Sequence, residues 1–183
     1  GDWKFVDQNG DGVIDLDDRV DLGNPLPAAT MGLNLSFDYK NWDFAAYAFA
    51  SLGNEIVRNY ERNLPFTNKP IAYLDGWTGP GSTNSAPRVT TGATSNISFS
   101  DFYVEDGSFV RLQNAQLGYT FSNDEDAAID KLRIYLSGNN LFTLTEYSGY
   151  DPTAGTGAPI GGGIDQGFYP TARTIFLGVN VKF

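Results

Sequence analysis

Residues 173–183 read Arg-Thr-Ile-Phe-Leu-Gly-Val-Asn-Val-Lys-Phe, and this stretch decides the expected fold. Successive side chains of an extended chain point to opposite faces, so every second residue shares a face. One face carries Ile175, Leu177, Val179, Val181 and Phe183, and the other carries Thr174, Phe176, Gly178, Asn180 and Lys182. This alternation predicts a β-strand whose apolar face meets either lipid or the core of a soluble β-sandwich.

Working outward from this strand, composition excludes several classes of function. The 183 residues include 22 acidic and 12 basic side chains, for a net charge of -10, so we expect no nucleic-acid partner. Cysteine and histidine are both missing, which removes thiol chemistry, imidazole bases and the usual zinc or copper ligands. Any bound metal ion would therefore have oxygen ligands.

Hydropathy does not exclude a membrane. The longest apolar run, residues 44–50, is far shorter than the roughly 18 residues that a spanning helix needs. The mean hydropathy of -0.28 is also compatible with membrane strands, because lipid-facing and lumen-facing residues alternate and average out. The opening residues 1–5 have neither signal-peptide character nor an initiator Met, so we expect the sequence to come from inside a longer chain.

A calcium motif occupies residues 7–18, which read Asp-Gln-Asn-Gly-Asp-Gly-Val-Ile-Asp-Leu-Asp-Asp. Oxygen side chains fall at positions 1, 3, 5, 9 and 12 of an EF-hand loop, and Gly12 falls where that loop turns sharply. The expected cofactor is Ca²⁺, with ligands Asp7, Asn9, Asp11, Asp15 and Asp18 and the carbonyl of Val13. The last position is Asp rather than Glu, the segment before the loop looks extended, and no second copy follows. The alternative is an acidic, solvated turn without an ion.

Four further stretches alternate in the same way. We expect strands at 29–39, 42–51, 108–121, 131–144 and 172–183, with Lys40-Asn41 as a two-residue hairpin turn and a short polar turn at 122–131. In the third strand, Ala115, Leu117, Tyr119 and Phe121 would face lipid. Arg111 and Gln113 share their odd numbering, so we expect both on the same face, above the bilayer.

Periodicity fails in residues 52–107 and 145–171, which are rich in Gly, Pro, Asn, Ser and Thr. Structureless loops of this length are unusual in a compact soluble domain but expected on the outer side of a membrane β-barrel. Both loops carry aromatic side chains, whose faces can stack on sugars or hold peptide side chains. The candidate substrate contacts are Trp77, Tyr73 and Tyr150. The alternative is that these side chains pack loop against loop.

A series of fragments resembles one family. They are DQNGDGVID (7–15), GNP (23–25), DFYVEDGSFVRL (101–112), LGY (117–119), SGNNL (137–141), YSGYDP (147–152), YP (169–170) and the 173–183 strand. In order and spacing they are similar to the C-terminal end of SusC-like TonB-dependent outer-membrane transporters, over essentially the whole chain.

The resemblance implies an all-β fold, the last five strands of a barrel of about 22 antiparallel strands around a plug. Residues 1–28 would be an extracellular loop with the calcium site, and residues 29–183 would supply the strands and the extracellular loops 52–107 and 145–171. The turns at 40–41 and 122–131 would be periplasmic. The implied partners are the lipid bilayer, the rest of the same barrel with its plug, a SusD-like surface lipoprotein, and TonB through a missing N-terminal part. The implied function is outer-membrane uptake of oligosaccharides or peptides.

Two other functions compete with this one. A secreted calcium-dependent binding or adhesion module would use the aromatic residues as the core of a soluble sandwich. An enzyme is not expected, because the acid runs Glu105-Asp106 and Asp124-Glu125-Asp126 are typical of solvated turns rather than of paired catalytic carboxylates.

Overall fold

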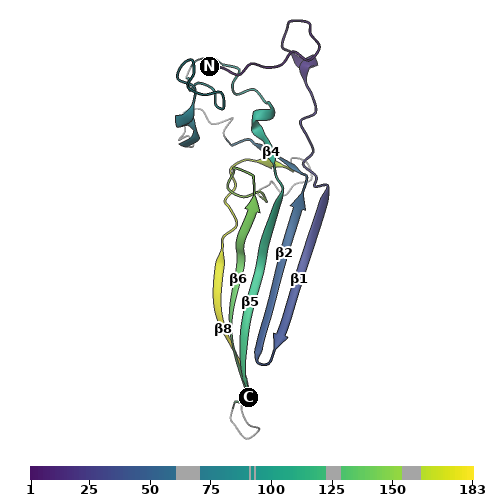
Figure 1. Cartoon of the computed structure of the whole chain (residues 1–183), viewed down its shortest axis with the longest axis vertical. Coiled ribbons are helices and arrows are strands. Elements are labelled where there is room, and N and C mark those ends of the chain that lie inside the picture. The colour runs from purple at the N-terminus through teal and green to yellow at the C-terminus, as the bar shows by residue number, and fades with distance from the viewer. Residues whose placement is uncertain (61–70, 91, 93, 123–128, 154–161) are drawn as a thin grey trace.

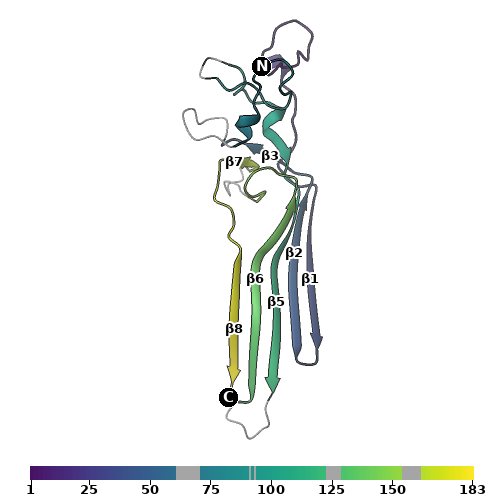
Figure 2. The ribbon, with the colours of Figure 1, turned by 60° about the vertical axis from the view of Figure 1, so that its left-hand side comes forward.

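The chain forms one long antiparallel sheet with a group of folded loops at one end (Figures 1 and 2). The computed structural model describes residues 1–60, 71–90, 92, 94–122, 129–153 and 162–183. The sheet has the order β1-β2-β5-β6-β8. Its strands are β1 (Ala29–Tyr39), β2 (Trp42–Leu52), β5 (Phe109–Ser122), β6 (Lys131–Thr145) and β8 (Thr174–Lys182). In the described part of the chain, no helix is long and apolar enough to cross a membrane.

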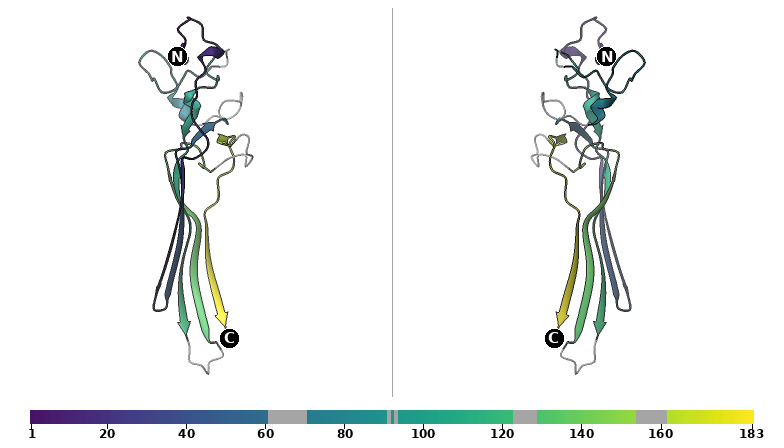
Figure 3. Two further views of the ribbon diagram at one scale, coloured as in Figure 1. Left: turned by 90° about the vertical axis from the view of Figure 1, so that its right-hand side faces the viewer. Right: turned by 90° about the vertical axis from the view of Figure 1, so that its left-hand side faces the viewer.

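The strands follow one another as a meander. Tyr39 pairs with Trp42, so residues 40 and 41 make a two-residue turn, in which Lys40 has a φ of 54°. This turn lies at the same end of the sheet as the C-terminus, and the loops lie at the other end (Figure 3). Most of the expected 122–131 turn, residues 123–128, is outside the described residues.

Register divides the sheet into an apolar and a polar face, because residues paired across antiparallel strands lie on the same face. On the apolar face, Leu35 pairs with Ala46 and Phe37 with Phe44. The same face continues through Leu117, Leu136 and Leu177, which pair in register. These side chains have no second layer over them in the described structure, and Leu177 is 75% exposed. The sheet is therefore a single layer that shows apolar side chains to its surroundings.

A β-bulge in β5 changes which residues lie on which face. Leu112 pairs with Ala48 and Asn114 with Tyr47, so Gln113 is an extra residue with no partner on β2. Residues with even numbers above the bulge, Val110 and Leu112, therefore share the apolar face with residues of odd number below it. The expectation that Arg111 lies on the same face as the lower odd residues is wrong, because the bulge moves Arg111 to the polar face.

An ion pair crosses the lower half of the polar face. Arg133 of β6 donates hydrogen bonds from Nε (2.8 Å) and Nη2 to the carboxylate of Asp43 on β2, although β5 lies between these strands. The pair can form because β5 has Gly118 at this level: a Cβ there would lie 2.6 Å from Arg133 Nη2. The guanidinium also lies over the ring of Tyr135, 4.7 Å from its centroid. Gly118 on β5 thus leaves room for an ion pair that joins β2 to β6 across the strand between them.

The loops that were expected to be structureless contain a second, smaller sheet. It has the order β4-β3-β7, with β3 (Glu55–Arg58) antiparallel to β4 (Val104–Asp106) and parallel to β7 (Ile164–Asp165). Short 3₁₀ helices lie at Leu16–Asp18, Ile71–Asp75 and Asp101–Tyr103. Because β3 and β4 come from the 52–107 loop and β7 from the 145–171 loop, this sheet joins the two loops.

The buried core lies at this loop end. The buried hydrophobic residues, between 2% and 6% exposed, are Ile56, Tyr103, Phe109 and Tyr147. The Tyr147 hydroxyl donates a 2.7 Å hydrogen bond to Asp165, which is 1% exposed. Burial and then this hydrogen bond raise the pKa of Tyr147, so its hydroxyl remains protonated. The loops therefore fold around their own core, while the sheet has none in the described chain.

The bulge gives a sharp test of these two faces. Deleting Gln113 from the full-length protein would move Arg111 onto the apolar face, where a basic side chain in contact with lipid costs from about 0 to 1 kcal/mol near the interface to about 2 to 4 kcal/mol at the midplane. We expect a large loss of folded protein, measured as the thermal unfolding midpoint and the yield of purified protein in detergent. The matched control is Gln113→Ala, which keeps the extra residue and should unfold close to wild type. Equal stability of the deletion and the control would contradict the assignment.

Candidate functional site

Three groups of residues at the loop end are candidates for function: the 7–18 loop, the loop aromatic side chains, and a polar pocket. The 7–18 loop is exposed, and Gly10 and Gly12 have φ values of 78° and 86°, which permit its tight turn. The Asp7 carboxylate accepts hydrogen bonds from the amides of Gly10 (2.6 Å) and Gly12 (2.8 Å). This carboxylate therefore organises the turn.

The other side chains proposed as calcium ligands also accept hydrogen bonds from backbone amides of the loop. Asn9 accepts from the amide of Asp11, Asp11 from that of Val13, and Asp15 from that of Asp17. The Asp18 carboxylate receives the amides of Asp15 and Gln8 and so joins the two ends of the loop, and these bonds lower its pKa. In the described residues, no three His, Cys, Asp or Glu side chains are gathered to hold a metal ion. The structure thus winds the expected ligands into one loop without converging their carboxylates.

The segment before this loop is fastened to the 52–107 loop. The Asp2 carboxylate receives both Arg88 Nε and Nη2 at 2.8 Å, and also Asn96 Nδ2 at 2.8 Å. The guanidinium of Arg88 and the desolvation that opposes it leave the pKa of Asp2 lowered to about 2. The Trp3 ring packs against Phe102 with 4.8 Å between centroids. The 7–18 loop therefore starts from a fixed base.

The three aromatic candidates for substrate contact have different surroundings. Trp77 packs its ring against Gly1, so closely that a Cβ on that glycine would clash. Tyr73 is part of the 3₁₀ helix Ile71–Asp75 and is half-buried. Tyr150 is 71% exposed, and its ring stacks on Tyr60 at 6.1 Å. Of these three, Tyr150 is the one that lines the polar pocket described next.

A buried ion pair organises that pocket. Arg111, on the polar face of β5, donates from Nη2 to Asp151 (2.6 Å), from Nε to Thr143 (2.7 Å) and from Nη1 to Thr153 (3.2 Å). The two charged side chains are 7% and 5% exposed. Asp151 also receives the amides of Thr153 (2.9 Å) and Thr171 (3.0 Å). The pair thus joins the sheet to two segments of the 145–171 loop.

The carboxylate of this pair stays ionised. Burial by itself would raise the pKa of Asp151, but the hydrogen bonds from Thr153, Thr171 and Arg111 outweigh burial and lower this pKa well below its ordinary value.

The sequence did not predict this site, because its alternation places Arg111 on the other face of the sheet. The available signal was the change of apolar residues from even numbers, Val110 and Leu112, to odd numbers, Ala115 and Leu117.

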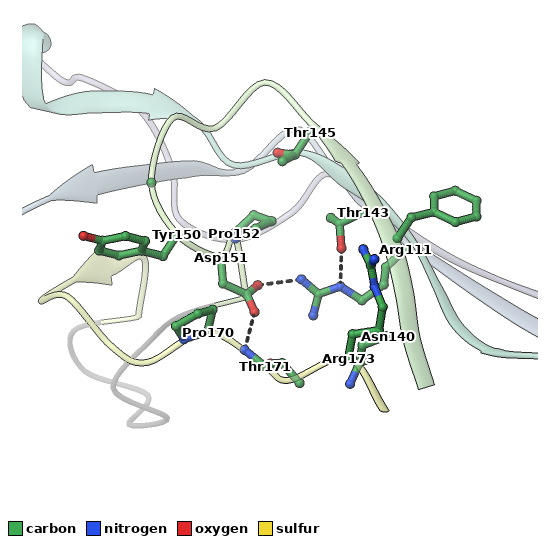
Figure 4. Close-up of a pocket in the computed structure, with 12 residues that line it drawn as sticks. Arg111, Asn140, Thr143, Thr145, Tyr150, Asp151, Pro152, Pro170, Thr171 and Arg173 are labelled. Carbon is green, nitrogen blue, oxygen red and sulfur yellow. Dashed lines mark hydrogen bonds and ion pairs between the residues drawn. The ribbon is translucent and has the colours of Figure 1, made fainter. Parts of the chain in front are cut away.

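The cavity, here called the Arg111 pocket, has a volume of about 400 Å³ (Figure 4). It opens where β6 continues to Thr145 while the pairing of β8 with β6 ends at Asn139 and Thr174. Its lining comes from β5, from β6, from the 145–153 segment and from the 170–173 segment. Its charged lining residues are Arg111, Asp151 and Arg173, and Tyr150, Pro152 and Pro170 add ring and apolar surface.

Removing one partner of the buried pair should destabilise the loop end. Asp151→Ala leaves the Arg111 charge buried without a counterion, and we expect a loss of about 3 to 5 kcal/mol. Because the folded-state pKa of Asp151 is lowered, the stabilisation it provides is present above the unfolded pKa of about 3.9 and is lost as pH falls below it. Thermal unfolding of the full-length protein between about pH 7 and pH 3 measures both effects.

The control for this measurement is Asp101→Ala, at an exposed residue in the 3₁₀ helix Asp101–Tyr103. It should unfold like wild type at every pH. An Asp151→Ala protein as stable as this control, or one whose stability falls with acid as wild type does, would contradict the role of the ion pair.

Comparison with known proteins identifies relatives of the chain among outer-membrane receptors. No protein-family model matches the sequence. It is 36% identical to TonB-dependent receptor P26 of Formosa agariphila, over 100% of this chain and 20% of that receptor. It is 32% identical to TonB-dependent receptor SusC of Bacteroides thetaiotaomicron, over 98% of this chain and 17% of that receptor. The chain thus spans about a fifth of the length of these relatives.

Solved structures agree with the sequence comparison. The fold matches the RagAB peptide transporter with a TM-score of 0.73 and 25% identity, covering 93% of this chain and 19% of that one. It matches the open-open state of the RagAB peptide importer with a TM-score of 0.67 and 25% identity, covering 86% of this chain and 17% of that one. By sequence and by fold, this chain is part of a SusC-like TonB-dependent receptor, a β-barrel protein of the bacterial outer membrane.

Proposed function

We propose that the chain supplies part of the wall and the extracellular rim of a TonB-dependent transporter that takes up oligosaccharides or peptides across the outer membrane. The observation that carries the proposal is the single-layer sheet with one continuous apolar face, from Leu35 to Leu177, which has no covering layer in the described structure. A face of this kind is stable against lipid hydrocarbon. The polar face, with Asp43, Arg133 and Arg111, then lines the interior.

The outer edges of β1 and β8 need partners. In the described sheet these two strands are the terminal ones, so each presents one row of backbone N–H and C=O groups without a neighbour. Unpaired backbone groups are costly in lipid, and about eight strands are the minimum for a closed barrel. Further strands of the same barrel, which would enclose the plug, therefore pair with both edges. The relatives are about five times as long as this chain, which is enough chain for the missing strands.

Partners follow from the two ends of the sheet. The folded loops would face outward, where a SusD-like lipoprotein would cover them, and TonB would act from the periplasm through parts of the receptor outside this chain. Peptides and oligosaccharides are both proposed as substrates. RagAB is a peptide transporter, and the resemblance of this sequence to SusC-like transporters implies either class. The relatives are receptors and transporters, and we propose no enzymatic activity for this chain. They also favour this function over a secreted adhesion module.

Location and uptake test the proposal together. The full-length protein should fractionate with the outer membrane and require detergent for extraction. Cells that carry it should take up an oligosaccharide or peptide nutrient, and deleting TonB should abolish this uptake while leaving the amount of receptor unchanged. A full-length protein that stays soluble without detergent, or uptake that is independent of TonB, would contradict the function.

A bound Ca²⁺ at residues 7–18 is a second part of the proposal. Its support is the spacing of the oxygen donors, the positive φ of Gly10 and Gly12, and the tight winding of the loop around Asp7. An ionised carboxylate has about four lone-pair sites, so the amide bonds seen here leave acceptor capacity for an ion. Calcium would draw the carboxylates together, offset their repulsion and stiffen a loop at the rim, next to the proposed lipoprotein.

Calcium binding can be separated from a general effect of charge. We expect Asp11→Ala to weaken Ca²⁺ binding at least about tenfold, because it removes one of the oxygen ligands. The matched control is Asp17→Ala, which removes the same charge from the same loop but not a proposed ligand. Isothermal titration of the full-length, chelator-treated receptor with CaCl₂ measures both. No calcium binding by wild type, or equal weakening by the two variants, would rule the site out.

A further inference from the structure

The side chains that line the Arg111 pocket carry an unbalanced charge, and one of the charged side chains, Arg173, is exposed. Its charged lining residues are Arg111, Arg173 and Asp151. Asp151 is fully engaged, because its carboxylate receives Arg111 Nη2, the Thr153 hydroxyl and amide, and the Thr171 amide. Among the residues that the structure describes, Arg173 forms no ion pair. The lining therefore carries one positive charge beyond its own anion.

The buried guanidinium also has donors to spare. An Arg side chain has five N–H groups, and Arg111 directs three of them to Thr143, Thr153 and Asp151. Two N–H groups of Arg111 remain without a partner in the described structure. The side chain is 7% exposed, and its other three N–H groups hold it in position. A guanidinium fixed in this way is preorganised, so a ligand that accepts from it loses little to side-chain ordering.

The remaining lining fits the body of a small molecule. The volume of about 400 Å³ lies within the range of ligand sites, roughly 300 to 1,000 Å³. Tyr150 is 71% exposed at the edge of the pocket, and its ring stacks on Tyr60 with 6.1 Å between the centroids. Pro152 and Pro170 add apolar surface. A sugar ring or an apolar side chain could pack here while an anionic group reaches the arginines.

We propose that the Arg111 pocket binds a carboxylate of the transported molecule, with Arg173 supplying the uncompensated charge and Arg111 supplying further N–H donors. The planar fork of a guanidinium matches the two oxygens of a carboxylate, which favours this group over a hydroxyl. The proposal rests on the transport function above and specifies its substrate class: a glycan that contains a uronic acid, or a peptide that presents its C-terminal carboxylate. Both sources offer the same group next to a ring or an apolar side chain.

The charge of the whole chain narrows this class further. With a net charge of -10, the chain repels polyanions at long range, and one positive charge in one pocket does not reverse that repulsion. A molecule with a single carboxylate, or with carboxylates spaced along a mostly neutral chain, avoids most of this repulsion and still meets the arginine. The acidic charge of this chain therefore favours an isolated carboxylate over a polyanion as the proposed ligand.

Binding measurements on the purified full-length receptor test the proposal. The probes are two matched pairs: a tripeptide and its C-terminal amide, and a uronic-acid disaccharide and its methyl ester. In each pair the second compound lacks the negative charge. In at least one pair, wild type should bind the carboxylate at least about tenfold more tightly, the worth of hydrogen bonds to a charged group. The pair that shows the difference identifies the source.

Variants then assign the difference to the pocket. Arg173→Gln should remove the discrimination within the pair, and Arg173→Lys should keep part of it because the charge remains. Arg19→Gln, which removes an exposed arginine in the N-terminal segment, is the matched control and should bind like wild type. None of these variants should change the amount of receptor in the outer membrane.

Every result decides the question. Discrimination that survives in Arg173→Gln, equal binding within both pairs by wild type, or no binding of either carboxylate probe would overturn the proposal. These outcomes are distinct from a failure of the transport function, which would appear as a receptor outside the outer membrane or as uptake independent of TonB. A functional transporter that ignores carboxylates would therefore reject this inference alone.

Discussion

The extra residue in β5 is the constraint on which both halves of the structure depend. Below Gln113, residues of odd number face the apolar side; above it, residues of even number do. The neighbouring strand is irregular at the same level, where Asn140 has a φ of 51°. Side-chain amides replace part of the lost ladder, since Asn114 donates to Asn139 at 2.7 Å and Asn140 to the carbonyl of Ala172 at 3.1 Å. The bulge thus keeps a continuous apolar face while it places the charged Arg111 on the polar face.

The sheet and the loops are stabilised in different ways. In the loops, side chains such as Ile56 and Tyr147 are buried within this chain, and the small sheet β4-β3-β7 links segments that lie far apart in sequence. In the long sheet, strand β1 is exposed along its whole length. Its stability must come from lipid on one face and from neighbouring strands at its edges. A part of the barrel wall that lacks a core of its own can nevertheless carry a folded rim.

Alternation in the sequence was enough to predict the long strands, and their bounds fall within two residues of those expected. Period two is dictated by the environment on each face, so it is visible in a single sequence. The bulge was not predicted, because we assigned faces by odd and even residue number along the whole strand, whereas the two faces exchange at Gln113. The small sheet could not be predicted, since β7 has two residues and its parallel pairing with β3 is set by contacts about a hundred residues apart. The same holds for the Arg111 pocket, whose lining comes from separate segments.

The buried ion pair couples the loop end to the wall. The carboxylate of Asp151, in the 145–153 segment, accepts hydrogen bonds from Arg111 on β5 and from the amide of Thr171, in the segment that leads into β8. If the 145–153 segment moved away from the sheet, Arg111 would keep its charge and lose its counterion in a place where water is largely excluded. Breaking a buried pair in this way costs several kcal/mol, whereas a solvated pair contributes about 1 kcal/mol or less. The same interaction therefore holds the pocket in shape and makes this part of the rim move with the barrel wall rather than independently of it.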